Sequence, residues 1–138
     1  MERRQVVIRY ARTSGAALDS SLLEVVWEGF LPRALGPASF RPPVDVFETP
    51  ELLLVTVEIA GVADDAYQVV LRDDVLIVTG ERPWRVPPGE VHVLLSEIRY
   101  GSFRVEIELP VGIRVAGAKA TYERGLLRIA LAKEARPR

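Results

Sequence analysis

Apolar and polar side chains alternate along short runs of the chain from Val44 onward. The clearest run is SFRVEIEL, residues 102–109, in which every second side chain is apolar. A period of two residues is typical of a β-strand with one buried face and one face in water. The other strand-like runs are VDVFE (44–48), LLLVTVEIA (52–60), YQVVLR (67–72), VLIVTGE (75–81), VHVLL (91–95), AKATYE (118–123) and LLRIAL (126–131). Short strands that follow one another without helical periods predict an all-β fold, an antiparallel sandwich or barrel.

The apolar content of individual runs favours the sandwich. LLLVTV and VLIVTG carry apolar residues on both faces, as strands that are covered on both sides do. The sequence Arg72-Asp73-Asp74-Val75 predicts a tight hairpin turn between two of the runs. We interpret the charged face of residues 102–109 as a face that provides solubility and cross-strand ion pairs.

A long connection separates the runs that end at Glu81 and begin near Gly101. It reads RPWRVPPGEVHVLLSEIR, residues 82–99, and contains the strand-like piece VHVLL. A strand in the middle of such a connection needs a sheet edge to pair with, and a second subunit can provide one.

The only convincing helix signal lies before residue 40. Ser21 and Glu24 have the spacing of a capping box, and Pro32 ends the segment LLEVVWEGFL, residues 22–31. This helix is apolar around nearly its whole circumference, so another surface must bury it. The proline-rich stretch PRALGPASFRPP, residues 32–43, follows and is interpreted as a linker.

The first fifteen residues, MERRQVVIRYARTSG, are basic and lack the apolar core of a secretory signal. We expect a solvated N-terminal arm here; a targeting segment or a contact with nucleic acid is the alternative. One short basic arm is weak evidence for nucleic-acid binding, and we expect none.

Composition adds bounds to this picture. The 138 residues suffice for one domain with short arms, and 49% hydrophobic and 27% charged residues are typical of a globular protein. No apolar stretch is long enough to span a membrane, so we expect a soluble protein without a membrane partner. The chain has no cysteine, which removes disulfides and thiol chemistry and fits a cytoplasmic location.

Candidate catalytic chemistry is scarce. The single histidine, His92, has Ser96 and Glu97 so near in sequence that a catalytic triad is not feasible. One histidine without cysteine is a poor metal-ligand set, and neither lysine belongs to a phosphate-binding loop. Glu106 and Glu108 share a strand face like a glycosidase pair, but that face is most simply the solvated one. We therefore predict a protein that is not an enzyme and binds no cofactor and no metal.

Four segments, taken together and in this order, carry a family resemblance. They are VDVFETPELLLVTVEIAGV (44–62), VLIVTGER (75–82), RYGSFRVEIELPVGI (99–113) and AKATYERGLLRIALAK (118–133). Over about two thirds of its length the chain resembles small heat-shock proteins in their α-crystallin domain. The residues that match the family's signature are Tyr100, Gly101, Phe103, Leu109, Pro110, Ala120, Gly125, Leu126 and Leu127.

The resemblance implies an immunoglobulin-like antiparallel β-sandwich that works as an ATP-independent chaperone. It implies a homodimer in which the strand from the long connection pairs with the neighbour's sheet, and unfolding client proteins as further partners. The residues expected at this strand exchange are Trp84, Val91, Val93, Leu95 and Arg99. The apolar residues expected to contact clients or other subunits are Leu22, Val26, Trp27 and Phe30. Gly101 would allow a sharp turn out of the connection, and Pro110 would end the strand.

Three features depart from the family pattern. Val105 stands where the family usually has arginine, and Arg104, one residue earlier, faces the opposite side of the strand. Gly-Leu-Leu at residues 125–127 replaces Gly-Val-Leu, and the residues after Leu131 contain no Ile-x-Ile segment for linking dimers. We therefore expect a dimer or a small oligomer. Val6 and Ile8 are candidates to take the place of that segment in a groove at a neighbour's sheet edge.

These observations divide the chain into an N-terminal arm with its apolar helix (1–42), the α-crystallin domain (43–133) and a short tail (134–138). Two other classes stay open. One is a co-chaperone or adaptor sandwich that binds a single defined partner. The other is a carbohydrate-binding or hydrolytic sandwich that uses Trp84, Tyr100 and Glu97.

Overall fold

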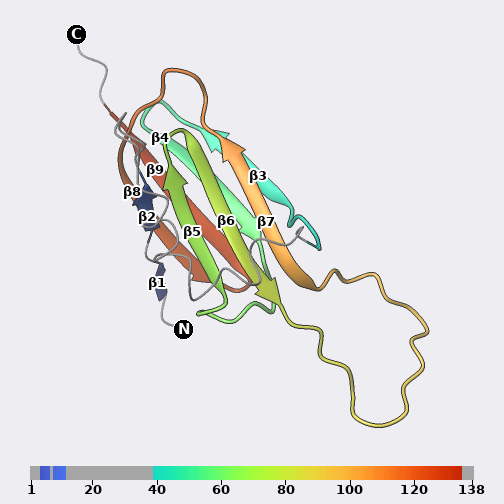
Figure 1. Ribbon diagram of the computed structural model, residues 1–138. Helices are drawn as coiled ribbons and strands as arrows, with labels where there is room; N and C mark the ends of the chain where they lie inside the picture. Colours follow the sequence, from blue (N-terminus) through green and yellow to red (C-terminus); the bar gives the residue numbers. More distant parts are fainter. Residues whose placement is uncertain (1–3, 7, 12–38, 135–138) are drawn as a thin grey trace, which may run out of the picture.

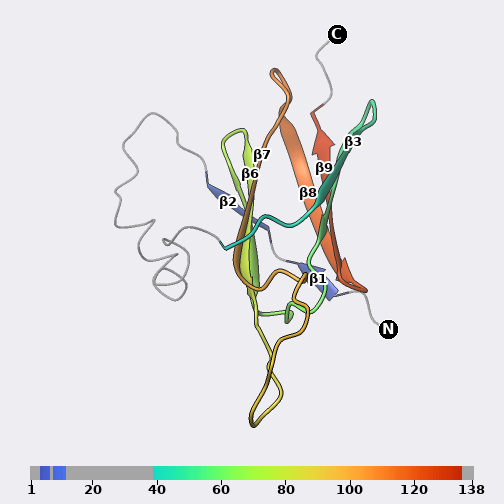
Figure 2. The same cartoon turned by 90° about the vertical axis from the view of Figure 1, so that its right-hand side faces the viewer.

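The computed structural model describes residues 4–6, 8–11 and 39–134, and in these ranges the chain forms two β-sheets that pack face to face (Figures 1 and 2). The strands are β1 (Arg4–Val6), β2 (Ile8–Ala11), β3 (Val44–Glu48), β4 (Leu52–Glu58), β5 (Tyr67–Arg72), β6 (Val75–Arg82), β7 (Gly101–Glu108), β8 (Val115–Glu123) and β9 (Leu126–Lys133). One sheet has the order β1-β8-β9-β4-β3, and the other has the order β2-β5-β6-β7. The predicted all-β sandwich is confirmed; the predicted helix over residues 22–31 lies outside the described residues.

The predicted runs form strands close to their expected bounds, with one exception. Residues 91–95, predicted as a strand, lie in the connection between β6 and β7 and form no ladder with any described strand. The strands from β3 to β9 pair with one another in antiparallel ladders. The predicted turn over residues 72–75 joins β5 to β6.

The core fills the space between the two sheets. In β4 the alternation places Leu53, Val55 and Val57 inside, and the intervening side chains are more exposed. Side chains of the other sheet face them, among them Val78 of β6 and Phe103 of β7, and Ile129 and Leu131 of the neighbouring β9 lie beside them; all four are at most 2% exposed. Burial of each such side chain stabilises the fold by about 1.5–3 kcal/mol. The sandwich therefore has a complete core of its own within the described residues.

Phe103 depends on a glycine in the neighbouring strand. Gly80 of β6 lies opposite Phe103 of β7 in the ladder, and both residues are buried. A Cβ atom at Gly80 would lie 2.5 Å from Phe103 Cζ and 2.5 Å from the carbonyl oxygen of Ala66. The glycine thus provides the space that the largest fully buried side chain occupies.

The turn between β8 and β9 explains another signature residue. Arg124 and Gly125 both have positive φ, 52° and 80°, as a two-residue type I′ hairpin turn requires. The amide of Ile59 donates to the Gly125 carbonyl oxygen at 2.9 Å, and a Cβ atom at Gly125 would approach Ala60 Cβ to 2.8 Å. Glycine is needed here both for its backbone conformation and for this close approach.

The charged face of β7 differs from the expectation of cross-strand ion pairs. Arg104 Nε donates to Glu106 Oε1 at 2.7 Å along the same strand. The cross-strand neighbours of these residues are Thr79 and Ile77, which carry no charge. Val105, between them, is fully buried, which places Arg104 on the outer side of the strand.

The N-terminal segment (residues 4–6 and 8–11) is part of the sandwich, so the solvated arm expected there is wrong. β1 pairs antiparallel with β8, with Val6 opposite Ala120, and β2 pairs parallel with β5, with Ile8 opposite Val69. The segment therefore joins the outer strands of both sheets on the same side of the molecule.

Tyr122 of β8 ties a loop to the sandwich. Its ring packs against Tyr67 with the centroids 5.1 Å apart, and its hydroxyl lies 2.9 Å and 3.0 Å from the carbonyl oxygens of Ile59 and Val62, to which it can donate. Burial is the main cause that raises the pKa of Tyr122, and the neighbouring Asp64 and Glu58 act in the same direction.

We predict that Gly80→Ala lowers the free energy of unfolding by about 1–3 kcal/mol, because the added methyl group overpacks the core at Phe103. Gly117→Ala is the matched control, since a Cβ atom there meets nothing within 4 Å. Chemical denaturation measures both variants. Equal stability of the two variants would contradict the close packing at Gly80.

We predict that Tyr122→Phe lowers the free energy of unfolding by about 1 kcal/mol at pH 7, because a partly buried hydrogen-bond donor is lost. The raised pKa means that the folded state favours the neutral phenol. The stabilisation that the neutral phenol provides is complete below about 10, the pKa of tyrosine in the unfolded chain, and it is lost as the pH rises through the pKa of Tyr122 in the folded state. Stability measured from pH 8 to 12 should therefore fall less steeply for Tyr122→Phe than for the parent chain. Parallel curves would contradict this role.

Candidate functional site

The connection between β6 and β7, here called the connecting loop (residues 83–100), extends beyond the end of the sandwich (Figures 1 and 2). It carries most of the large apolar side chains that the described residues expose: Trp84, Val86, Val91, Val93, Leu94, Leu95 and Ile98. Leu94 and Leu95 are 94% and 77% exposed. Because the core is complete without them, these side chains form an apolar surface that the fold of the single chain does not use.

Arg82, the last residue of β6, fixes the base of the connecting loop. Its Nε donates to the carbonyl oxygen of Arg99 at 2.8 Å, and its Nη1 donates to that of Ala60 at 3.2 Å. Its guanidinium carbon lies 4.7 Å from the ring centroid of Phe40, within the range of a cation–π contact. The two ends of the loop are thus held together and against the sandwich.

Two aromatic residues stack across the base of the loop. The rings of Trp84 and Tyr100 have centroids 6.4 Å apart and are inclined by 28°. The next residue, Gly101, has a φ of +99° and lies close to Ser39, whose Oγ would be 2.9 Å from an added Cβ atom. The predicted sharp turn out of the loop is present at this glycine.

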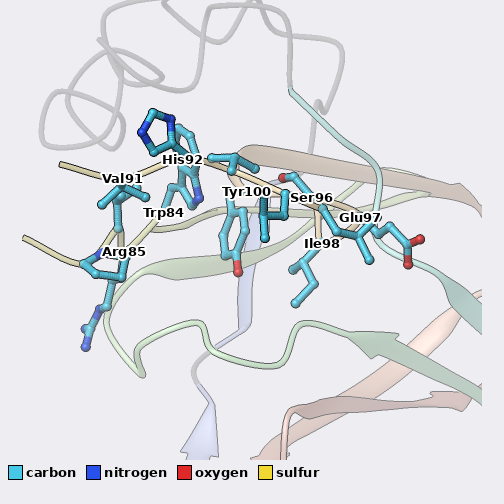
Figure 3. A pocket seen from close by; sticks show the side chains of 13 residues that line it. Trp84, Arg85, Val91, His92, Ser96, Glu97, Ile98 and Tyr100 are labelled. Carbon is cyan, nitrogen blue, oxygen red and sulfur yellow. The ribbon is translucent and has the colours of Figure 1, made fainter.

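Side chains from both halves of the connecting loop surround a shallow pocket (Figure 3). Trp84 and Glu97 lie at its two ends, with Tyr100 between them. His92 also lines the pocket, and its Nε2 lies 3.5 Å from the carboxylate of Glu90, with both side chains largely in solvent. Among the described residues, no three histidine, cysteine, aspartate or glutamate side chains are grouped to hold a metal ion.

The outer edge of β3 is the second exposed feature. The amide of Glu58 in β4 donates to the carbonyl oxygen of Pro43 at 3.1 Å, and the amide of Thr49 donates to the carbonyl oxygen of Leu52 at 2.8 Å. In an antiparallel ladder this alternation turns the backbone groups of residues 44, 46 and 48 away from β4. In the described part of the chain no strand pairs with them, and Val46 and Phe47 are exposed beside this edge.

The predicted site residues fall into three groups. The five expected at strand exchange (Trp84, Val91, Val93, Leu95, Arg99) all lie in the connecting loop and are exposed. Of the signature residues, Phe103, Leu109, Ala120 and Leu127 are buried, Tyr100, Gly101, Gly125 and Leu126 are partly buried, and Pro110 is exposed just after β7. Leu22, Val26, Trp27 and Phe30 lie outside the described residues, and Val6 and Ile8 lie in β1 and β2 of the chain's own sheets.

Sequence reasoning missed Arg82, Phe40 and the exposed pair Val46 and Phe47. Arg82 precedes a proline and carries no local signal for its bonds across 17 and 22 residues. Val46 and Phe47 did offer a signal of exposure. Two consecutive apolar residues in a strand place one side chain on each face, so one of the two must point away from the core.

Comparison with known proteins identifies the class. Residues 45–138 match the model of the Hsp20/alpha crystallin family. Heat shock protein 16 of Schizosaccharomyces pombe is 31% identical over 99 residues, which are 70% of this chain and 69% of that protein. Heat shock protein 42 of Saccharomyces cerevisiae is 29% identical over 98 residues, and the match spans 68% of this chain but 26% of that protein.

A solved structure agrees with the sequence matches. The fold superposes on a small heat-shock protein from Xylella fastidiosa with a TM-score of 0.65 and 28% identity, covering 73% of this chain and 93% of that one. The chain therefore belongs to the Hsp20/alpha crystallin family of small heat-shock proteins. In the described ranges, no helix has the length and apolar character needed to cross a membrane.

Proposed function

We propose that this protein is an ATP-independent holdase, which binds unfolding proteins through exposed apolar side chains and prevents their aggregation. The observation that supports this most directly is the connecting loop, where Val86 and Ile98 are 45% and 62% exposed although the sandwich core is already complete. An unfolding protein exposes apolar segments of varied sequence, and a surface of this kind can cover them.

The strength and selectivity of such binding follow from its physical nature. Each leucine or phenylalanine side chain that becomes buried contributes about 1.5–3 kcal/mol, and the interaction has no strict direction. A few such contacts give reversible binding of many unrelated clients, because little in the surface discriminates between them. The apolar segment over residues 22–31, with Leu22, Val26, Trp27 and Phe30, is the second part of the proposed client surface.

The proposed activity requires no bond making or breaking. We propose that the protein is not an enzyme, that it acts without cofactor or metal, and that it works in the cytoplasm without nucleic-acid or membrane partners. The stacking of Trp84 on Tyr100 is relevant to the carbohydrate-binding alternative. These rings cover one another at the loop base, so fewer of their faces are available to a sugar.

We further propose a homodimer in which residues 91–95 of one copy pair with the outer edge of β3 of the other. Each feature lacks a partner within the described chain: residues 91–95 have strand character but no ladder, and residues 44, 46 and 48 direct backbone groups outward. Addition of residues 91–95 of one copy as a strand at the β3 edge of the other would provide hydrogen-bond partners for the backbone groups of both segments. Val46 and Phe47, exposed beside the edge, would then be covered by the incoming segment.

We predict that Trp27→Asp combined with Phe30→Asp leaves the sandwich folded but weakens protection of a heat-labile client by at least about tenfold, because two apolar contacts are lost from the client surface. Light scattering of the heated client measures protection, and circular dichroism reports the fold. Arg128→Asp, at an exposed residue of β9, is the control, because it changes the net charge by the same amount as the double variant but at another place.

Unchanged protection by the double variant would refute the proposed role of residues 22–31. A single stoichiometric complex with one partner, without protection of unrelated clients, would instead favour the adaptor class.

We predict that Val46→Pro converts the dimer to monomers without unfolding the chain. Proline removes an amide donor at the outer edge of β3, whereas the ladder to β4 uses the alternate residues. Val46→Thr keeps the donor and a similar side-chain shape, so it should remain dimeric. Deletion of residues 91–95 should also give monomers. Light scattering coupled to size-exclusion chromatography measures the masses, and a dimer that survives both changes would contradict strand exchange at this edge.

A further inference from the structure

The outer face of the four-stranded sheet (β2-β5-β6-β7) is buried at its centre. Val70 of β5 and Ile77 of β6 are ladder partners on this face, and each is only 7% exposed. Thr79, two residues along β6 on the same face, is 4% exposed. The core cluster takes the alternate residues of these strands, such as Val69 and Val78, and includes neither Val70 nor Ile77. Burial of these outer side chains therefore calls for a cover on the side of the sheet that faces away from the core.

The outer face of the five-stranded sheet is different. Leu54 of β4 and Ala130 of β9 are ladder partners at the centre of that face, yet both are only partly buried, and Arg128 on the same face is exposed. The two outer faces point in opposite directions, with β6 and β7 on one side of the sandwich and β8 and β9 on the other (Figure 2). The cover therefore belongs to one face of the sandwich only.

The chain between residues 11 and 39 starts and finishes at opposite edges of the four-stranded sheet. β2, which ends at Ala11, is one outer strand of this sheet, and β7 is the other. Beside β7, the amides of Ser39 and Phe40 donate to the carbonyl oxygen of Ser102 at 2.8 Å and 3.2 Å. The inner face of the sheet is filled by the core, so the direct route between the two edges runs over the outer face.

The apolar segment 22–31 has a suitable length for this route. Neighbouring strands lie about 4.8 Å apart, so the sheet measures about 14 Å from β2 to β7. A helix over residues 22–31, as the capping box predicts, would be about 15 Å long. Residues 12–21 and 32–38 are then left for the two connections, and the shorter one can span roughly 23 Å.

The chemistry of the segment and of the face also agrees. The segment is apolar around nearly its whole circumference, so it needs a surface that buries it. The face has Val70 and Ile77 at its centre, and Arg104 and Glu106 of β7 lie beside them in the ladder and pair with each other. A helix that packs on one face of a sheet is a stable layer arrangement.

We propose that the outer face of β5 and β6 is a docking surface for residues 22–31 of the same chain. Both ends of the connection are attached to this sheet, so the chain's own segment is present at a high effective concentration. One consequence rests on the proposed holdase function: a client and the sheet face compete for the same apolar side chains. The fraction of chains with an undocked segment then sets the apparent affinity for clients.

The fluorescence of Trp27 tests the docking. Trp84→Phe leaves Trp27 as the only tryptophan, and a chain without cysteine accepts a nitroxide, which quenches an indole at close range, at one engineered cysteine. Glu106→Cys places the label beside Ile77 on the proposed docking surface. Arg128→Cys, also an exposed charged residue, places it on the outer face of the other sheet and is the matched control.

Docking predicts at least about threefold stronger quenching from residue 106 than from residue 128, because the docked state is the main population. Equal quenching from the two positions would overturn the proposal, since the segment then has no preference for this face.

A mixture identifies the chain that supplies the segment. The labelled Glu106→Cys chain, made without tryptophan by Trp27→Phe and Trp84→Phe, is mixed with an unlabelled chain that keeps Trp27. Little quenching in this mixture supports docking within one chain. Quenching as strong as in the singly labelled chain would show that a second copy covers the face, and would overturn the proposal.

A substitution on the face completes the test. Ile77→Asp should lower the quenching from residue 106 to the level of the residue 128 control, whereas Leu54→Asp, on the outer face of the other sheet, should leave it unchanged. Circular dichroism checks the fold, and Ile77→Thr is the milder variant for the same measurement. Unchanged quenching in a folded Ile77 variant would contradict docking at this face.

An excess of a heat-labile client should also weaken the quenching from residue 106, and quenching that stays constant while the client is protected would contradict the competition. Light scattering of the same sample shows whether the client is protected. The label measurements without client do not depend on holdase activity, so a failure of docking and a failure of the holdase proposal give different results.

Discussion

Two sheets packed face to face have four outer strands, and the backbone groups along those strands need partners. In this protein the outer strands are treated differently. Residues 4–6 pair with β8 and residues 8–11 pair with β5 on one side. On the other side, Ser39 and Phe40 donate to the carbonyl oxygen of Ser102 in β7, and the chain then continues into β3. The outer edge of β3, like those of β1 and β2, has no partner in the described chain, and the exposed Val46 and Phe47 beside it make it the edge of the proposed dimer.

Folding and binding use different side chains in this protein. The core between the sheets is filled by residues of β4 to β9, with Phe103 accommodated by Gly80 and the β8–β9 turn fitted against Ala60 by Gly125. No apolar residue of the connecting loop takes part in that core. Arg82 instead anchors the loop at its base, so the exposed side chains are presented from a fixed platform. A stable fold can in this way carry an apolar surface without using it.

Local patterns were sufficient for most of the fold. The period of two residues predicted β7, and the aspartate pair at 73 and 74 predicted the turn between β5 and β6. Where sequence reasoning failed, the deciding contacts were distant. Residues 6–10 read VVIRY and are rich in β-branched and aromatic residues, a strand signal that was missed. The ladder partners of residues 4–6 and 8–11, among them Ala120 and Val69, are far away in the chain. VHVLL has the pattern of a strand, yet a strand forms only where an edge is available, and no described edge of the same chain pairs with it.

The most direct test of the account is the mass of the purified full chain by light scattering at rising temperature, with and without a heat-labile client. The holdase account predicts that the client stays in solution in mixed complexes heavier than either protein alone, in the absence of ATP. A client that aggregates at the same temperature and rate whether or not this protein is present would contradict it.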